Sequence, residues 1–345
     1  MAYYTQEPWA SDPSIRQQAV KIAVVLVNLG TPDAPTPGAI RRYLAQFLAD
    51  RRIIEAPRWL WYPILHGIVL RTRPKKVAHA YASIWTENGS PLLDLTTKLA
   101  AKVASQFNGR VIVTTAMRYG SPSLHNVLDS LKQQNVQKLL LLPMFPQYSA
   151  STTASIMDNV MEIFGQWRVL PDFRFISQYA NEATYLDAIA SQIKSHRDSN
   201  GSSDTLVFSF HGLPQQYVDA GDVYQEQCLD TAKGVADRLS LGETDWLCCF
   251  QSRFGPKQWL MPYTDETLKA LPKQGVKSVD VICPGFAVDC LETVEEINIQ
   301  NREFFLAAGG DRFHYIPALN DSDLHANVLS AIVNHNIQDW LNQGD

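Results

Sequence analysis

The stretch TLVFSFHGLP, residues 205–214, decides the fold class of this chain. The run from Leu206 to Phe210 is almost wholly apolar, which is typical of a strand that is covered on both faces of a sheet. The run leads directly into His211 and a Gly-x-Pro turn, and glycine and proline usually end a strand. An imidazole at that position is either an ordinary core histidine or a metal ligand or proton acceptor at the carboxyl end of a strand.

Seven further apolar or β-branched runs are spread along the 345 residues. Segments with helical spacing, such as SLHNVLDSLKQQ, lie between most of these runs. Strands that alternate with helices predict parallel sheets with helices on both faces. The eight predicted strand runs are residues 23–30, 110–120, 138–149, 173–180, 205–214, 246–255, 279–289 and 312–321.

The two halves of the chain repeat one pattern. Leu29-Gly30-Thr31-Pro32 matches His211-Gly212-Leu213-Pro214, and Arg118-Tyr119-Gly120 matches Arg253-Phe254-Gly255, in the same order and at predicted strand ends. Ordered matches of this kind indicate a duplicated unit. We therefore predict an α/β fold of two similar doubly wound domains, each with a four-stranded parallel sheet flanked by helices, and an active cleft between them at the strand carboxyl ends.

The predicted halves are residues 1–180 and 181–320, and a helix at about 321–345 is expected to pack back on the first half. Only the first half carries a long insertion, at about residues 33–108, which contains the apolar segment WLWYPILHGIVL. If this segment forms the lip of a ligand cleft or contacts a membrane, Leu65 and Ile68 should be partly exposed. A helical hairpin packed on the core is an equally good interpretation. Four basic residues follow: Arg71, Arg73, Lys75 and Lys76.

The composition is that of an ordinary globular protein, with 46% hydrophobic and 19% charged residues. A net charge of −5 provides no overall basic field for nucleic acid. The sequence has no apolar run of about 18 residues, and we expect neither a membrane span nor a signal peptide. Its five cysteines lie between Cys228 and Cys290 without a CxxC pair, which favours a reducing cytoplasm over a disulfide framework or a structural zinc site.

A second informative stretch is FAVDCLETVEEINIQ, residues 286–300. If an α-helix begins near Asp289, then Asp289, Glu292 and Glu296 share an arc of about 60°. Helix capping explains Asp289 and Glu292 as a D-x-x-E pattern, but it does not explain Glu296 in the second turn. A row of carboxylates can relay protons or hydrated cations. The sequence lacks the P-loop, GxGxxG, HExxH and GxSxG motifs, so chemistry driven by nucleotide or hydride is not expected.

Taken together, these motifs resemble those of the ferrochelatase family, of the bacterial type, from Val24 to about Asn320. The resemblance implies an enzyme that inserts Fe²⁺ into protoporphyrin IX to give protohaem, the last step of haem biosynthesis, with release of two protons and without ATP. Two alternatives remain open, a cobalt or nickel tetrapyrrole chelatase and a non-enzymatic tetrapyrrole carrier. The motifs that carry the resemblance are LVNLGTP, YASIWTENGSPL, MRYG, LPMFPQYSASTTAS, FSFHGLP, CFQSRFGPKQWLMPYT and the D-x-x-E-T-x-x-E run.

The resemblance also implies roles for particular residues. His211 and Glu292 correspond to the catalytic pair at the metal site, and Asp289 and Glu296 correspond to an acidic path. Cys290 stands where many relatives have histidine, which leaves its role open. The positions that correspond to the porphyrin site are Leu29, Arg118, Tyr119, Tyr148, Ser149 and Trp259.

The expected partners are protoporphyrin IX and Fe²⁺, with Fe²⁺ as a substrate. We expect no resident cofactor and no iron–sulfur cluster, because no cysteine follows Cys290. A cytoplasmic monomer is favoured, with peripheral contact at the inner membrane and no nucleic-acid partner.

Overall fold

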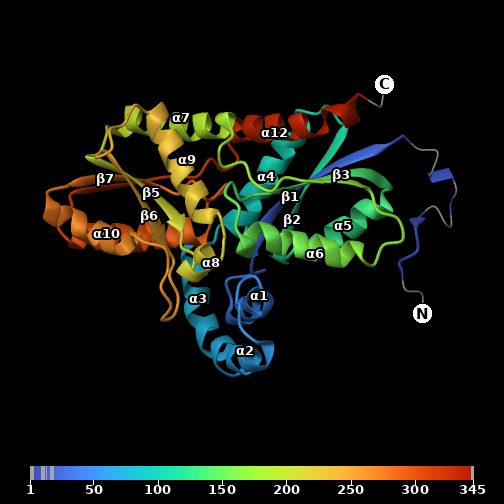
Figure 1. Cartoon of the computed structure of the whole chain (residues 1–345), viewed down its shortest axis with the longest axis horizontal. Helices are drawn as coiled ribbons and strands as arrows, with labels where there is room; N and C mark the ends of the chain where they lie inside the picture. Colours follow the sequence, from blue (N-terminus) through green and yellow to red (C-terminus); the bar gives the residue numbers. More distant parts are fainter. Residues whose placement is uncertain (1–3, 9–11, 13, 16–18, 343–345) are drawn as a thin grey trace. The chain divides into compact units, whose positions relative to one another are not determined.

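The computed structural model describes residues 4–8, 12, 14–15 and 19–342, so the N-terminal stretch in which no signal peptide was expected lies partly outside it. The chain divides into two compact units, which are coloured by sequence in Figure 1. Unit 1 comprises Met1–Met144, Ala150–Ser177 and Asp321–Asp345, and unit 2 comprises Phe145–Ser149 and Gln178–Asn320. The main change of unit, after Ser177, lies near the predicted division at residue 180.

Unit 1 contains a four-stranded parallel sheet in the order β2-β1-β3-β4. The inner strand β1 is buried along most of its length, which explains its continuous run of β-branched and aliphatic residues. The strands are β1 (Lys21–Thr31), β2 (Val111–Gly120), β3 (Val136–Pro143) and β4 (Asp172–Phe175).

Unit 2 contains a second four-stranded parallel sheet, in the order β6-β5-β7-β8. The equivalent strands of the two units occupy the same places in their sheets, which confirms the predicted pair of similar doubly wound halves. The strands are β5 (Thr205–His211), β6 (Trp246–Gln251), β7 (Ser278–Ile282) and β8 (Arg312–Ile316).

All eight predicted strands are present, but several end earlier than their predicted runs. The run 279–289 becomes a strand only as far as Ile282, because Pro284 and Gly285 cannot continue the ladder. From β3 onward, the predicted runs therefore combined the strand with the loop that follows it. In both halves, the residues predicted to form the functional site lie in or next to these loops.

Helices cover both faces of each sheet. In unit 2, residues of β7 alternate between the two faces, so that Val279 and Val281 pack with Leu268 and Ile297 in one apolar cluster. Asp280 points to the opposite face. The helical segments of unit 2 are α7 (Ala183–Asn200), α8 (Gln215–Asp219), α9 (Tyr224–Arg238), α10 (Thr264–Ala270), the 3₁₀ turn η5 (Leu271–Gln274), the π-helix η6 (Glu292–Asn301) and α11 (Arg302–Ala307).

In unit 1, α4 and α12 contact each other, and α12 also contacts β3, so the last helix packs on the first half of the chain. The helical segments of this unit are α1 (Pro37–Ala49), α2 (Arg58–Ile64), the π turn η3 (Leu65–Val69), α3 (Leu70–Ile84), α4 (Pro91–Ser105), α5 (Leu124–Gln133), the π turn η4 (Ala150–Ala154), α6 (Ser155–Phe164) and α12 (Asp323–Leu341).

Two glycines mark the same close backbone approach in the two units. A Cβ on Gly30 would lie 1.8 Å from the carbonyl oxygen of Tyr119, and a Cβ on Gly212 would lie 2.6 Å from that of Gln251. Gly30 is the penultimate residue of β1 and Gly212 directly follows β5, and in each unit the carbonyl lies at or next to the end of the neighbouring strand, β2 or β6. No larger residue fits either position without a backbone shift.

The insertion of unit 1 forms α1, α2, η3, α3 and α4, and α2 lies at the tip of the α1–α3 projection (Figure 1). Large apolar side chains on α2 and η3 are exposed, including Trp59 at 79% and Ile68 at 59%. The expectation of exposure is wrong for Leu65, which is fully buried. The reason is that η3 contacts α1, so one side of the segment is core and the other faces solvent.

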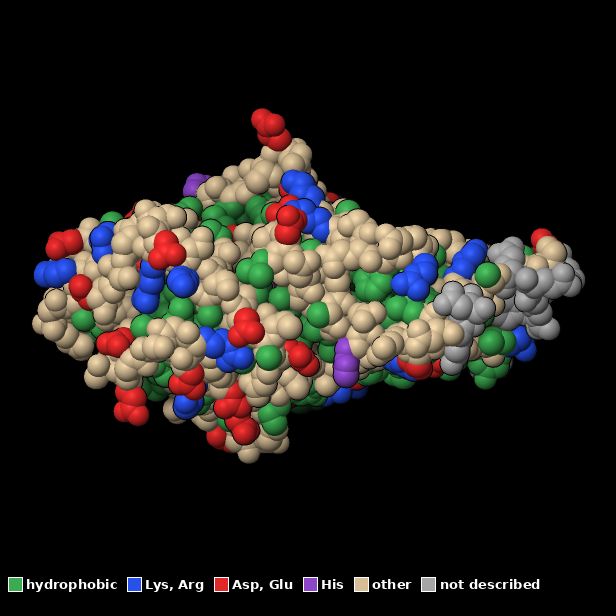
Figure 2. Space-filling view, turned by 90° about the horizontal axis from the view of Figure 1, so that it is seen from above, with side chains coloured by type: hydrophobic (Ala, Val, Ile, Leu, Met, Phe, Trp, Pro, Cys, Tyr) green, Lys and Arg blue, Asp and Glu red, His purple; other side chains and the backbone are tan. Residues whose placement is uncertain are grey.

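Acidic and basic side chains are interspersed over the face of the described residues drawn in Figure 2. This mixture agrees with the small net charge of −5 and gives, on that face, no continuous basic surface of the kind that binds nucleic acid. Among the described residues, no helix combines the length and the apolar character that crossing a membrane requires.

We expect Leu65→Ala and Ile68→Ala to differ strongly in stability. Leu65→Ala removes buried methyl groups and should lower the free energy of unfolding by about 2–5 kcal/mol. Ile68→Ala changes an exposed side chain, so we expect a change within about 0.5 kcal/mol. Urea denaturation of the two variants measures this difference, and equal losses would show that both positions belong to the core.

Candidate active site

His211 is the last residue of β5, and its Cα is paired in register with that of Gln251 at the end of β6. The ring Nδ1 lies 2.7 Å from the carbonyl oxygen of Gly212. A carbonyl only accepts hydrogen bonds, so in the neutral ring Nδ1 carries the proton and Nε2 keeps its lone pair. His211 is therefore held in the tautomer that can bind a metal ion or accept a proton through Nε2.

The turn after His211 is tightly constrained. The Gly212 amide donates to the Gln251 carbonyl at 2.6 Å, and a Cβ on Gly212 would lie 3.2 Å from the ring of Trp259. The indole of Trp259 donates to the Phe254 carbonyl at 2.9 Å, which fixes that ring. The Gly-x-Pro turn thus allows the backbone next to His211 to pass beneath an aromatic ring, and Trp259 is the predicted porphyrin residue that lies beside it.

The carboxylates after β7 lie on a different kind of helix from the one predicted. The segment Glu292–Asn301 is a π-helix, and no side chain caps its first turn, so the predicted α-helix capped by Asp289 is wrong. The Asn301 side-chain amide donates to the Glu296 carbonyl five residues back at 2.8 Å, in keeping with the wider i→i+5 turn. Glu292 and Glu296 are both in this helix, whereas Asp289 precedes it.

Asp289 is buried in a dense set of hydrogen bonds. Its carboxylate accepts from the Tyr315 hydroxyl, from Thr293 Oγ1 at 3.0 Å, from the Asn320 amide at 2.8 Å and from the Ala318 backbone at 3.3 Å. These contacts anchor the loop after β7 to the segment that follows β8. The role of Asp289 in an acidic path stays a prediction.

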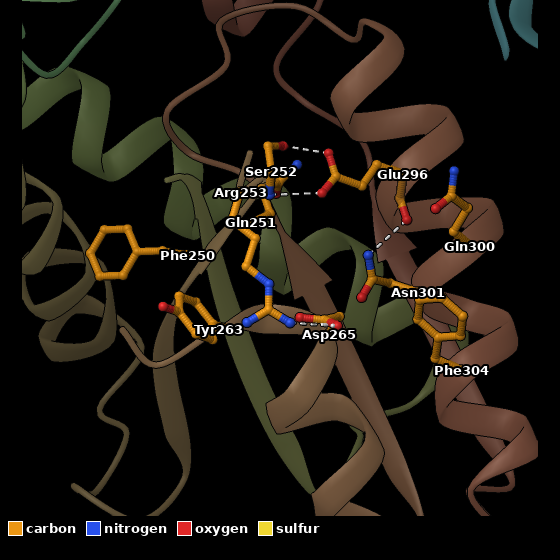
Figure 3. Close-up of a pocket in the computed structure, with 10 residues that line it drawn as sticks. All are labelled: Phe250, Gln251, Ser252, Arg253, Tyr263, Asp265, Glu296, Gln300, Asn301 and Phe304. Carbon is orange, nitrogen blue, oxygen red and sulfur yellow. Dashed lines mark hydrogen bonds and ion pairs between the residues drawn. The ribbon is translucent and has the colours of Figure 1, made fainter. Parts of the chain in front are cut away.

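Glu296 is held by Ser252, directly after β6. The Ser252 backbone donates to Oε1 at 2.8 Å and its hydroxyl donates to Oε2 (Figure 3). Burial raises the pKa of Glu296, the Ser252 bonds and the nearby His211 oppose that rise, and the negative charge of Glu292 adds to it. His211 and Glu292 are therefore both close enough to Glu296 to act on its pKa.

Ser252 itself has a left-handed backbone, with a φ of 63°. This conformation is uncommon for residues other than glycine, and such strain is frequent at functional sites. Here it turns both the amide and the hydroxyl of one residue toward the same carboxylate.

A pocket of about 170 Å³ opens beside Glu296, between the end of β6, α10 and η6 (Figure 3). On its wall, the guanidinium of Arg253 lies 4.0 Å from the centre of the Tyr263 ring and pairs with Asp265 and Glu266 at 3.4 and 2.8 Å. The Arg253 charge is therefore compensated by its neighbours. The pocket has room for several water molecules of about 30 Å³ each, and Glu296 is one of the residues that line it.

Gln251 connects the strands to the π-helix. Its side-chain amide donates to the Glu292 carbonyl at 2.8 Å, and its Oε1 accepts from the hydroxyl of Ser209 at 2.7 Å. Sequence reasoning did not single out Gln251 or Ser252 as site residues. The available signal was their position at the end of the strand run that neighbours His211, where polar side chains follow the apolar WLCCF.

Cys290, whose role the resemblance left open, is buried. Burial and the adjacent negative charge of Glu292 raise the pKa of the Cys290 thiol well above its usual value. The thiol therefore stays protonated at neutral pH, and Cys290 is not a proton acceptor beside Glu292.

Three of the predicted porphyrin residues lie in unit 1. Leu29 is half-buried on β1. Arg118 donates to Ser155 and pairs with Asp50, and the hydroxyl of the buried Tyr119 donates to Asp50 at 2.7 Å. Burial raises the pKa of the Tyr119 phenol. The polar ends of Arg118 and Tyr119 are thus already bonded within unit 1.

The other three lie in unit 2: Trp259 beside the turn after His211, and Tyr148 and Ser149 in the short segment that follows β3. The Tyr148 backbone donates to the Gln227 side chain at 2.7 Å, and the Ser149 hydroxyl donates to Asp222 at 3.0 Å. Asp222 immediately precedes α9 and Gln227 lies in it, so both contacts hold the segment against this helix. The side chain of Tyr148 remains half-buried.

Comparison with known proteins gives one consistent result. Residues 21–337 match the family model described as Ferrochelatase. The chain is 52% identical over 324 residues to the ferrochelatase of Marinobacter nauticus, which covers 93% of this chain and 88% of that protein. It is 49% identical over 322 residues to Ferrochelatase 1 of Shewanella oneidensis, which covers 92% of this chain and 96% of that protein.

Solved structures share the fold at low sequence identity. SirB from Bacillus subtilis with Fe³⁺ has a TM-score of 0.53 at 10% identity, over 94% of this chain and 99% of that chain. A sirohydrochlorin chelatase SirB in complex with cobalt, from Bacillus subtilis subspecies spizizenii, has a TM-score of 0.52 at 9% identity, over 94% and 99% of the two chains. These likenesses support the two-sheet architecture alone.

We expect Glu296→Gln to stabilise the protein in a pH-dependent way. A raised pKa means that the folded state holds the proton of Glu296 more tightly than the unfolded state does. The contribution of Glu296 to the free energy of unfolding is therefore most favourable below pH 4.5, the usual pKa of a glutamate. This contribution is lost as the pH rises through the pKa that Glu296 has in the folded state. Glutamine keeps an acceptor for the Ser252 amide but carries no buried charge.

Thermal melting of the wild type and of Glu296→Gln from pH 4 to pH 8 tests this expectation. The variant should melt close to the wild type at the acidic end and above it near neutrality. Glu303→Gln, a change at an exposed position of α11, is the matched control and should show no such trend. A variant that is less stable at every pH would show that the Ser252 bonds outweigh the cost of burial.

Proposed function

The chain belongs to the ferrochelatase family, and we propose that His211 and Glu292 carry its reaction, the insertion of Fe²⁺ into a porphyrin. The enzyme is a metal chelatase of the lyase class. We propose protoporphyrin IX as the porphyrin and protohaem as the product. The observation that supports this assignment is the grouping of His211, Glu292 and Glu296 at the end of the second sheet, where Gln251 pairs in register with His211 and donates to the Glu292 carbonyl, and where His211 and Glu292 both act on the pKa of Glu296.

Metal insertion is a charge-balanced exchange. One Fe²⁺ enters the macrocycle and two pyrrole N–H protons leave, so neither an oxidant nor a reductant is required. The protein must therefore provide an acceptor for protons and a transient position for the metal. An imidazole and a carboxylate are suitable for both tasks at neutral pH.

His211 supplies the first of these groups. Because Nδ1 donates its proton to the Gly212 carbonyl, Nε2 keeps a lone pair that can bind a metal ion or accept a proton. Glu292 supplies the second group, and Gln251 fixes its backbone by accepting from Ser209 and donating to the Glu292 carbonyl. The positions of both groups are set by β5 and β6 before substrate binds, which lowers the cost of organising the site.

Glu296 acts one turn further along η6. Because its pKa is raised, it exchanges protons closer to neutral pH than an exposed glutamate does. It borders the pocket, which has room for water, so it connects the region of His211 with water (Figure 3). We assign it to the path by which protons or hydrated cations pass, together with Asp289, whose carboxylate also anchors the loop.

For the macrocycle we propose contacts of two kinds. Leu29, Tyr148 and Trp259 are half-buried and offer apolar or aromatic surface. Arg118, Tyr119 and Ser149 are engaged in hydrogen bonds within their own units, and they act by holding the loops that border the ring.

We propose that the reaction uses Fe²⁺ as a substrate and that no iron–sulfur cluster is resident. A cluster requires cysteine thiolates. Burial raises the thiol pKa of all five cysteines, which opposes ionisation. Four of the five are buried and none forms a disulfide.

We further propose that the enzyme works as a monomer in the cytoplasm with peripheral contact at the inner membrane. The exposed apolar side chains of α2 and η3 are followed on α3 by four exposed basic residues, Arg71, Arg73, Lys75 and Lys76. Apolar groups beside a basic stretch favour an anionic lipid surface.

His211→Ala should cut the rate of metal insertion by about 10²–10⁴-fold, the usual contribution of a general base, while porphyrin still binds. Anaerobic loss of porphyrin fluorescence on addition of Fe²⁺ measures the rate, and fluorescence titration measures binding. His125→Ala, an exposed histidine of α5, is the matched control. A fully active His211→Ala variant would contradict the assignment of His211. If the wild type binds porphyrin but inserts no Fe²⁺, the protein is a carrier and not an enzyme.

Reversing the charge of Lys75 and Lys76 should weaken binding to vesicles that contain anionic lipid. The loss should be several-fold at low salt and smaller at high salt, because ions screen exposed charges over about 10 Å at 0.1 M. Vesicle sedimentation measures the effect. Lys194→Glu, on the exposed side of α7, serves as the control. Equal binding by the reversed variant and the control would contradict the membrane proposal.

A further inference from the structure

We propose that unit 2 holds a second site for a divalent first-row transition metal, formed by His196, Asp280 and His314. One ligand atom from each of these three residues lies within 4.8 Å of the other two. The site is separate from the chemistry proposed for His211, and it does not rest on the proposed function.

The topology of unit 2 brings the three residues together. Asp280 of β7 and His314 of β8 are partners in register on neighbouring parallel strands. Their side chains lie on the face of the sheet opposite the apolar cluster that contains Val279 and Val281. On that face α7 contributes His196, whose ring centre lies 5.2 Å from that of His314.

One pair of these groups already has the spacing of two metal ligands. Oδ1 of Asp280 lies 3.3 Å from Nδ1 of His314. Ligand bonds of about 2.0–2.2 Å in a tetrahedral zinc site place neighbouring ligand atoms roughly 3.3 Å apart. The remaining separations reach up to 4.8 Å, so a bound ion draws the His196 ring inward by a small rotation.

His196 offers an unused donor. Its Nε2 is buried and has no hydrogen-bond partner among the residues that the structure describes. A buried polar nitrogen without a partner is costly, and a metal ion would satisfy it.

The carboxylate is fixed by outer contacts, as ligating carboxylates generally are. Asp280 is fully buried; Arg197 Nε donates to its Oδ2 at 2.9 Å and the Ser203 hydroxyl donates to its Oδ1 at 2.7 Å. The same Oδ1 also lies 3.3 Å from Nδ1 of His314. Since Arg197 already compensates the charge of Asp280, we expect weaker binding than in a structural zinc site with uncompensated thiolates.

Two imidazoles and one carboxylate favour ions of the Fe²⁺ to Zn²⁺ series over Mg²⁺ and Ca²⁺, which prefer oxygen ligands.

The register of the sheet shows that this site is separate from the candidate active site at His211. Asp280 pairs with Leu206, five residues before His211, so the two sites lie about 16 Å apart along the strand at about 3.3 Å per residue. A bound ion would link α7 to β7 and β8.

Co²⁺ is the probe for the test, because its visible absorbance reports the number and geometry of its ligands. The titration uses the full chain with His211→Ala, which silences the proposed catalytic site. We expect one equivalent of Co²⁺ to bind with visible absorbance, and Zn²⁺ to displace it and raise the melting temperature, whereas Mg²⁺ does neither.

Adding His196→Gln or His314→Gln to this background should weaken Co²⁺ binding at least tenfold and abolish the absorbance. His125→Gln, which removes an exposed histidine of unit 1, should change nothing. Circular dichroism checks folding, and His196→Gln, which leaves the ion pair of Arg197 and Asp280 intact, decides the matter if His314→Gln does not fold. Unchanged Co²⁺ binding in His196→Gln, or no bound Co²⁺ in the His211→Ala background, would overturn the proposal.

Discussion

The candidate site depends on the attachment of η6 to the end of β6. Gln251 and Ser252 are consecutive residues, and they hold the backbone of Glu292 and the carboxylate of Glu296 respectively. Gln251 is also the register partner of His211. A strand end, rather than a flexible loop, therefore fixes the spacing between the imidazole and both glutamates. Hydrogen bonds to a rigid sheet are the means by which a short segment holds charged groups that would otherwise repel each other.

Asp289 and Glu296 show how two carboxylates that are close in sequence acquire different surroundings. Asp289 accepts hydrogen bonds from three neighbouring segments. Among the described residues, the side-chain carboxylate of Glu296 accepts hydrogen bonds from Ser252 and lies beside a pocket, and burial is the largest influence on its pKa. One carboxylate therefore ties together several segments, while the other is held by a single residue. Spacing along the sequence does not reveal this difference, because the donors come from β6 and from the end of β8.

Much of the architecture was predictable because strands buried on both faces leave a plain signal. All eight strands and the duplication follow from apolar runs and ordered turns such as the one after His211. The π-helix was not predictable in this way, because apolar spacing alone does not separate i→i+5 from i→i+4 turns over ten residues. Leu65 was misplaced for a related reason, since a wholly apolar segment does not show which of its sides contacts α1. Ser252 was missed because its left-handed conformation has no signature in a serine.

The paired glycines have a consequence for how the two halves of the chain differ. Gly30 and Gly212 occupy equivalent points of the two halves, and the residues before them are Leu29 and His211. The same backbone frame therefore presents an aliphatic side chain in one copy and an imidazole in the other. Both halves therefore keep the close backbone approach, whereas only the second has an imidazole before the glycine. The first half thus keeps the frame of the second without its imidazole, and it is the half that carries the long insertion between its first two strands.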